Sequence, residues 1–333
     1  MTGPVRIAGS VICTGSGRLT SPAGAVPAWT GSASSTGAVP LWAGSASSAG
    51  VGSASGRLVS SAGVVSVPER LTSSGIVVSF RCSKLRAVDT PEPFRADLSR
   101  SVRLLRAFRL EQSDPDFFYG TLARDTVAQL TTYTDLAGAT VADVGGGPGY
   151  FADALRAVGA RPVCVDCDAG EMRLRDGALP RDAVLGSALD LPLATGSVDV
   201  CFSSNVLEHV PNPLRMADEM VRVTRPGGIV YLSYTVWLGP WGGHETSPWH
   251  YLGGHYAARR YARRHGKPPK NVYGESMYAI GVAKPLAWAR RCRDAEILDA
   301  VPRYLPRWAR HVVHLPGIRE LVTWNLLLVL RRR

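Results

Sequence analysis

The chain has 333 residues, 45% of them hydrophobic and 20% charged, enough for one large folded domain or two small ones. Its net charge is +11, but residues 88–221 carry twelve bases against twenty acids, whereas residues 222–333 carry nineteen against six. This distribution argues against a nucleic-acid partner and indicates a basic C-terminal face. The sequence contains no apolar run of about eighteen residues and no signal-peptide pattern, and its six cysteines are scattered. We therefore expect a cytoplasmic protein without a spanning helix.

The first 90 residues differ in composition from the rest of the chain. GAVPAWTGSASST at 24–36 is followed directly by GAVPLWAGSASSA at 37–49, and Gly, Ser and Ala dominate. Such a segment sustains no apolar face and cannot bury enough surface to offset its ordering entropy. We predict a low-complexity, disordered extension over residues 1–90. A further hypothesis is that translation in the native host starts nearer Val88.

Alternating helix and strand patterns begin near Asp97. Two helices are predicted first, 97–112 and 115–133, and the first carries Leu98, Val102, Leu105 and Phe108 at helical spacing. Short β-branched runs then alternate with helical patterns, which is typical of an α/β fold with a doubly wound, mostly parallel sheet. The predicted strands are 139–145, 161–166, 182–188, 197–204, 227–237 and 323–333, and the further helices are 150–159, 169–177 and 213–224.

The stretch VADVGGGPGYF at 141–151 joins a predicted strand to a predicted helix. Glycine lets a ligand approach the backbone closely, and the helix that follows offers free N–H groups to an anion. A ligand site is therefore predicted here. Two patterns compete for it: Gly147-x-Gly149-x-x-Ala152 fits a dinucleotide fingerprint, whereas Asp143-x-Gly145-x-Gly147-x-Gly149 places an acid before the glycines.

Three later stretches favour the second pattern. VCVDCD at 163–168 ends a strand with Asp166, GSALDLPLATGSVDVCFSSNVLEHV spans 186–210, and RVTRPGG at 222–228 precedes another strand. In order and spacing these motifs resemble those of class I S-adenosylmethionine (SAM) dependent methyltransferases of the small-molecule or lipid type. The resemblance implies a seven-stranded doubly wound sheet and a methyltransferase domain over 97–333. One departure is Gly186-Ser187-Ala188, where the family often has an acid.

Residue by residue, the resemblance implies the following contacts to SAM. The glycines would pass under the methionyl part, Asp143 would serve the amino group, and Asp166 would accept from the ribose hydroxyls. Asn205 would lie near the sulfonium and Tyr150 would cover the cofactor. Ser187, Ala188 and Leu189 would flank adenine. The complete predicted set is Asp143, Gly145, Gly147, Gly149, Tyr150, Asp166, Ser187, Ala188, Leu189 and Asn205.

Residues 235–280 are longer than a simple connection and rich in Trp, His and Arg. We predict a substrate lid with a basic helix at 256–264. Candidate catalytic groups are His209, His244 and Glu245. The spacing of His244, Glu245, His250 and His255 fits no standard zinc pattern, so no metal site is predicted.

Basic residues among aromatics favour an anionic or amphiphilic methyl acceptor, such as a small acidic molecule or a lipid. Arg303, Arg307 and Arg310 with Trp308 and Leu305 are candidates for a peripheral membrane contact. Two other functions stay open. The chain could be an NAD(P)-dependent oxidoreductase that uses the same glycine loop, or a non-catalytic module that binds SAM or RNA.

Overall fold

The computed structural model describes residues 57–60, 63–66, 71–72, 75–76, 94–175 and 177–333. Most of the predicted disordered extension lies outside these residues. Inside it the structure describes two antiparallel pairs, which form a unit separate from the main domain. The strands are β1 (Arg57–Ser60), β2 (Gly63–Ser66), β3 (Leu71–Thr72) and β4 (Gly75–Ile76).

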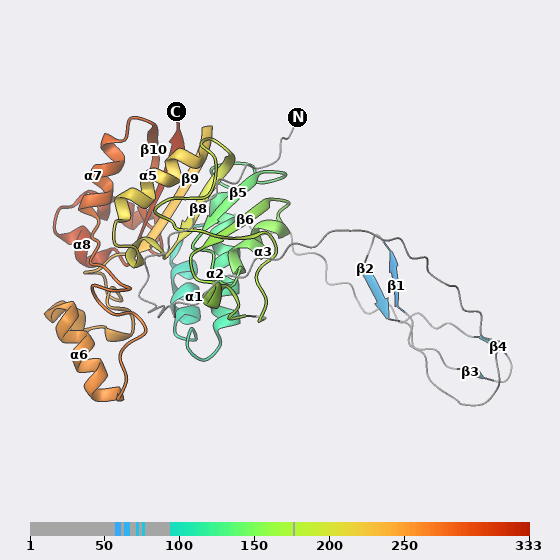
Figure 1. Ribbon diagram of the computed structural model, residues 1–333, viewed down its shortest axis with the longest axis horizontal. Coiled ribbons are helices and arrows are strands. Elements are labelled where there is room, and N and C mark those ends of the chain that lie inside the picture. Colours follow the sequence, from blue (N-terminus) through green and yellow to red (C-terminus); the bar gives the residue numbers. More distant parts are fainter. Residues whose placement is uncertain (1–56, 61–62, 67–70, 73–74, 77–93, 176) are drawn as a thin grey trace, which may run out of the picture. The chain divides into compact units, whose positions relative to one another are not determined.

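The main domain contains one seven-stranded sheet with the order β10-β11-β9-β8-β5-β6-β7 (Figure 1). Neighbours from β9 to β7 pair in parallel, whereas β11 runs antiparallel to both β9 and β10. The predicted doubly wound, mostly parallel, seven-stranded sheet is thus confirmed. The strands are β5 (Thr140–Val144), β6 (Arg161–Asp166), β7 (Ala183–Leu185), β8 (Val198–Ser204), β9 (Thr224–Thr235), β10 (Ala295–Pro302) and β11 (Asn325–Arg332).

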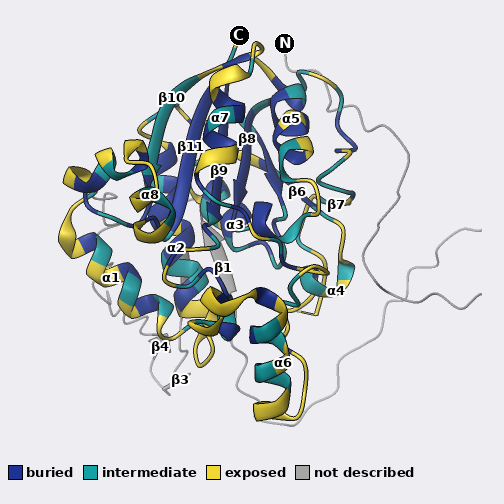
Figure 2. Cartoon of the chain, turned by 90° about the vertical axis from the view of Figure 1, so that its left-hand side faces the viewer, coloured by how far each residue is buried: buried dark blue, intermediate teal, exposed yellow. Residues whose placement is uncertain are grey.

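Helices cover both faces of the sheet, because alternate side chains of each strand point to opposite faces. On β5, Val141 packs into the cluster with the first three helices, whereas Ala142 and Val144 pack into the other cluster. Figure 2 shows the strands as the buried centre of the domain. One face is covered by α1 (Leu98–Phe108), α2 (Pro115–Leu130) and α3 (Tyr150–Ala157), and the other by α5 (Pro213–Val223) and α7 (Ala283–Arg291).

Local signals explain where these helices start. Asp97, Asp114 and Asn212 each accept a hydrogen bond from a first-turn N–H through the side chain, which caps α1, α2 and α5. Proline occupies the first helical position of α2 and α5, where its missing N–H costs no hydrogen bond. The predicted helices are therefore confirmed to within a few residues, although α4 (Ala169–Met172) is shorter than 169–177.

The face that α1 buries differs from the predicted one. Leu98 is 62% exposed and Val102 38%, whereas Leu104 and Ala107 are buried. Arg100 also points inward, since it pairs with a buried acid on α2. Leu105 and Phe108 of the predicted stripe are partly buried, so the buried face of α1 overlaps the predicted one only in part.

No element was predicted between residues 281 and 322, whereas the strand predicted at 323–333 is present as β11. Charged residues interrupt the apolar pattern of β10, so its sequence carries no clear strand period. Pairing with β11 over its whole length supplies the order instead. The other unpredicted elements are α7, η4 (Arg307–His314) and α8 (Ile318–Val322).

Two buried guanidinium groups connect the N-terminal helices to the sheet. Arg100 donates to both carboxylate oxygens of Asp125, at 2.7–3.1 Å, and to the carbonyl of Arg303 at 2.8 Å. Arg303 donates to Ser204 Oγ at 2.9 Å, to Ser233 Oγ at 2.7 Å and to Thr126 Oγ1. Because Arg303 is only 1% exposed, its predicted place on a membrane-facing surface is wrong. Arg307 and Trp308 are exposed, as that prediction requires.

No helix among the described residues is long and apolar enough to cross a membrane.

Replacing Asp125 by alanine should destabilise the domain strongly, because it leaves the buried Arg100 charge without its counter-ion. We expect a loss of about 3–5 kcal/mol in the free energy of unfolding, measured by urea denaturation. The control is Glu296→Ala, which breaks a half-exposed pair with Arg331 at 3.9 Å and should cost under about 1 kcal/mol. Equal losses in the two variants would contradict the structural role of Asp125.

Candidate functional site

The glycine loop follows β5 at its carboxyl end and leads into α3. A Cβ on Gly145 would lie 2.3 Å from the Val206 side chain, and one on Gly146 would lie 2.4 Å from Cys164 Sγ. Neither position accepts a larger residue without movement. A Cβ on Gly147, whose φ is +47°, would meet no atom of the described residues within 4 Å. Two glycines thus allow close packing, and the third leaves backbone accessible to a ligand.

Asp143 lies beneath this loop and is 1% exposed. Its Oδ2 has no hydrogen-bond partner among the described residues. Burial raises the pKa of this carboxyl to about 7, and the nearby charge of Asp166 adds to the effect. A buried acceptor of this kind is costly unless a partner supplies hydrogen bonds or positive charge.

Asp166 ends β6 and faces the glycine loop. Its Oδ2 accepts from Gly147 N at 3.0 Å, and its Oδ1 accepts from Asp168 N at 3.0 Å. The side chain is half-buried, and burial raises its pKa. Beyond β7 the predicted adenine segment forms a tight turn, in which Ser187 Oγ accepts from Leu189 N at 3.1 Å. Ala188 and Leu189 pack partly against the core.

Asn205 lies directly after β8, the strand next to β5. Its φ is +59°, a left-handed conformation that Asn tolerates better than most residues. Its Oδ1 accepts from Asn325 Nδ2 at 2.7 Å, which fixes the side chain. Tyr150 instead turns toward α2: its ring stacks on Tyr119 at 5.3 Å, and its hydroxyl donates to Asp116.

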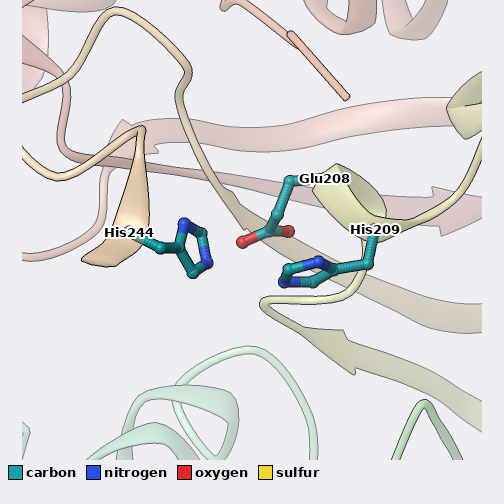
Figure 3. Close-up of side chains that lie close together, drawn as sticks. All are labelled: Glu208, His209 and His244. Carbon is teal, nitrogen blue, oxygen red and sulfur yellow. The ribbon is translucent and has the colours of Figure 1, made fainter. Parts of the chain in front are cut away.

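Three side chains gather at the carboxyl ends of β8 and β9. Glu208 and His209 belong to η1 (Leu207–His209), and His244 begins η2 (His244–Thr246). One possible ligand atom from each lies within 4.8 Å of the others, and the imidazole rings flank the carboxylate (Figure 3). The ring centroids are 5.1 Å apart and edge to face.

The polar atoms of this cluster are only partly paired. Glu208 Oε1 accepts from Thr235 N at 2.9 Å, whereas the buried Glu208 Oε2 and His244 Nδ1 lack hydrogen-bond partners among the described residues. His209 Nδ1 lies 2.7 Å from the carbonyl oxygen of Ser276. Because a carbonyl only accepts, Nδ1 carries the proton of the neutral ring and Nε2 presents a lone pair. Burial lowers the pKa of His244.

The 235–280 segment returns to its starting point, where Trp237 N donates to Ile280 O at 2.8 Å. Between these residues lie η2, η3 (Trp249–Leu252) and α6 (Gly254–His265), and α6 extends away from the sheet (Figures 1 and 2). The predicted basic helix at 256–264 is thus confirmed. A pocket inside the segment is lined by Glu245, Thr246, Ser247, Trp249, Ala257, Arg260, Tyr261, Arg264 and His265.

The structure places the predicted ligand residues near the carboxyl ends of β5, β6, β7 and β8, which are neighbouring strands. It brings His209 and His244 together but separates them from Glu245, whose carboxylate accepts from Asn271 N and Nδ2 at 2.8 and 2.9 Å. The sequence prediction missed Glu208. The position of Glu208 beside His209 at a strand end was the available signal. Its proximity to His244 could not be predicted from the sequence, because the two residues are far apart along the chain.

The chain is similar in sequence to known proteins. Residues 142–232 match the family model described as "Methyltransferase domain". A protein of Mycolicibacterium gilvum (strain PYR-GCK), described as an uncharacterized methyltransferase, is 55% identical over 249 residues, covering 71% of this chain and 96% of that protein. A protein of Mycobacteroides abscessus with the same description is 52% identical over 251 residues, covering 72% and 96%.

Among solved structures, an S-adenosylmethionine dependent methyltransferase from Mesorhizobium loti is 18% identical, with a TM-score of 0.44, and the match covers 63% of this chain and 98% of that one. The family match falls on the glycine loop and β5 to β9, and the relatives are more than half identical across nearly their full length. The chain therefore belongs to the class I SAM-dependent methyltransferases, and SAM is its methyl donor.

Proposed function

We propose that this methyltransferase acts on a hydroxyl oxygen of a small anionic or amphiphilic molecule, including lipids. The observation that carries this proposal is the cluster of Glu208, His209 and His244 at the carboxyl ends of β8 and β9. Ligands of open α/β sheets bind beyond these strand ends. A hydroxyl acceptor must lose a proton during methylation, and imidazoles beside a carboxylate suit that task.

The residues around the glycine loop fit SAM. Asp143 offers a buried, unpaired carboxylate oxygen to the SAM ammonium group, and Gly147 leaves its backbone open beside it. Asp166 provides carboxylate oxygens for the ribose hydroxyls, and residues 187–189 border the adenine. Bound SAM supplies an electrophilic methyl group. The protein's task is then to align the acceptor and exclude water.

On the acceptor side, His209 is the proposed base. Its Nδ1–H is held by the Ser276 carbonyl at 2.7 Å, so its Nε2 can accept the hydroxyl proton. Glu208 and His244 lie close enough to stabilise the imidazolium that forms. Glu245 has a supporting role instead, because its two bonds to Asn271 tie together two parts of the 235–280 segment.

Residues 235–280 are proposed as the lid that selects the acceptor. Their pocket combines Arg260 and Arg264 with Trp249 and Tyr261. The Arg260 guanidinium lies 3.8 Å from the centroid of a Trp249 ring. Cations beside aromatic faces favour an acceptor that has both an anionic group and an apolar part. Exposed Trp308 and Arg307 support a peripheral lipid contact.

Replacing Asp166 by alanine should weaken SAM binding by about 10-fold to 100-fold, because hydrogen bonds to a charged carboxylate contribute about 1.5–3 kcal/mol. Titration calorimetry with SAM measures the change, and NAD serves as a ligand that should not bind. Asp168→Asn, two residues away, is the control and should retain affinity. Unchanged SAM affinity in the Asp166 variant would reject the ribose assignment.

Replacing Asp143 by asparagine should have opposite effects on stability and binding. The folded-state pKa is raised from 3.8 to about 7, so the ligand-free protein loses stability as pH rises across that interval. Asparagine is neutral throughout and should stabilise the protein by roughly 1–4 kcal/mol at pH 8, but little at pH 4. Without the carboxylate charge, SAM affinity should fall about tenfold or more.

Thermal unfolding at several pH values and calorimetry with SAM test both effects. Asp294→Asn is the control, since that side chain is exposed. A stability gain that is independent of pH would contradict the assigned pKa.

The acceptor can be identified by transfer of a labelled methyl group from SAM into host extract fractions, followed by mass analysis of the product. A methyl ether on an anionic or amphiphilic molecule is expected. With that acceptor, His209→Ala should lower kcat by about 10²-fold to 10⁴-fold and leave SAM affinity unchanged. The control His255→Ala changes an exposed histidine of the lid. A product methylated on nitrogen or carbon would overturn the oxygen assignment.

A further inference from the structure

We propose that Glu208, His209 and His244 bind a divalent transition-metal ion on the acceptor side of the active site. The inference rests on the proposed function for the role of the ion, but its binding is argued from geometry alone. The structure groups His244 with Glu208 and His209, rather than with the residues near it in sequence.

The chemical composition of the cluster fits such an ion. Two imidazoles and one carboxylate form a ligand set that zinc and related divalent ions accept, with further positions left for water or substrate. The donor atoms lie within 4.8 Å of one another. Tetrahedral zinc with bonds of about 2.1 Å requires donors about 3.4 Å apart. Side-chain rotations that move the donor atoms by about an ångström would therefore bring them to the spacing that zinc requires.

Unpaired buried atoms provide independent evidence for a bound cation. Glu208 is 2% exposed, and its Oε2 has no hydrogen-bond partner among the described residues, although Oε1 is paired with Thr235 N. His244 Nδ1 is buried and likewise unpaired within the described part of the chain. A buried carboxylate oxygen without a partner carries a large desolvation cost, which a cation beside it would offset.

The surroundings hold the three side chains for coordination. The bond from His209 Nδ1 to the Ser276 carbonyl leaves Nε2 as the ligand atom, and metal-bound histidines commonly have such an outer partner. The Tyr278 N–H donates to the Glu208 carbonyl at 2.8 Å, so the returning end of the lid braces η1. His244 adopts a φ of +48°, a strained conformation for a non-glycine residue that occurs often at functional sites.

The position of the cluster suggests what the ion would do. Asn205, assigned to the sulfonium side, is three residues before Glu208. An ion here could bind the acceptor oxygen directly and lower the pKa of its hydroxyl. With its Nε2 bound to the ion, His209 would no longer take the proton, which would pass to solvent water, and the ion would orient the oxygen toward the methyl group.

Metal binding is tested on the full-length chain after removal of metals by a chelator. Zinc affinity is measured by competition with a chromophoric chelator, and cobalt(II) binding by its visible d–d absorption. We expect one ion per chain. Glu208→Gln, His209→Gln and His244→Ala should each weaken zinc binding by at least about tenfold, since each removes one of three ligands. The lid control His255→Ala should bind as the unmodified chain does.

Circular dichroism and SAM titration on the same samples verify folding, and SAM affinity should be unchanged. The proposal is overturned if zinc binds no more weakly to the three ligand variants than to the controls, or if metal-free protein methylates its acceptor at the full rate. The second result leaves the proposed function intact. Conversely, site-specific metal binding without any methyl transfer would support the metal site and reject the proposed function.

Discussion

The contact between Gly145 and Val206 is the constraint on which the active site depends. The missing Cβ lets the loop after β5 lie against the segment after β8, where any larger residue would overlap the valine side chain. These two strands are hydrogen-bonded neighbours at the centre of the sheet. The contact therefore brings the glycine loop close to Asn205 and the residues after it, which are the proposed donor and acceptor sides of the active site.

Buried charge has two different roles in this domain. Around Arg100 and Asp125 opposite charges neutralise each other and connect α1 and α2 to the sheet. Within the described part of the chain Asp143 Oδ2 has no such partner, and burial raises the pKa of this carboxyl. The first arrangement stabilises the fold, whereas the second belongs to the proposed binding site for the SAM ammonium group. Such a division between stability and function is common at active sites.

The acceptor side is built by segments distant in sequence. η1 follows β8, His244 follows β9, and Ser276 and Tyr278 come from the end of the 235–280 segment. Two hydrogen bonds therefore connect the end of this segment to His209 and Glu208. In the proposed function, these backbone contacts would couple substrate selection by the lid to chemistry at the strand ends.

The sequence alone determined the fold class, the succession of strands β5 to β9 along the chain and the methyl donor, because these depend on local signals. Strand periodicity, helix caps and the acid before the glycines can all be recognised within short windows. The dinucleotide alternative arose from those same glycines, and Asp143 with the later motifs favoured the methyltransferase family that the relatives show. Only the tertiary structure decided which face of α1 is buried, where Arg303 lies, and that Glu208 rather than Glu245 joins His209 and His244. Each of these depends on partners far along the chain, whose approach is set by sheet order and side-chain packing rather than by sequence spacing.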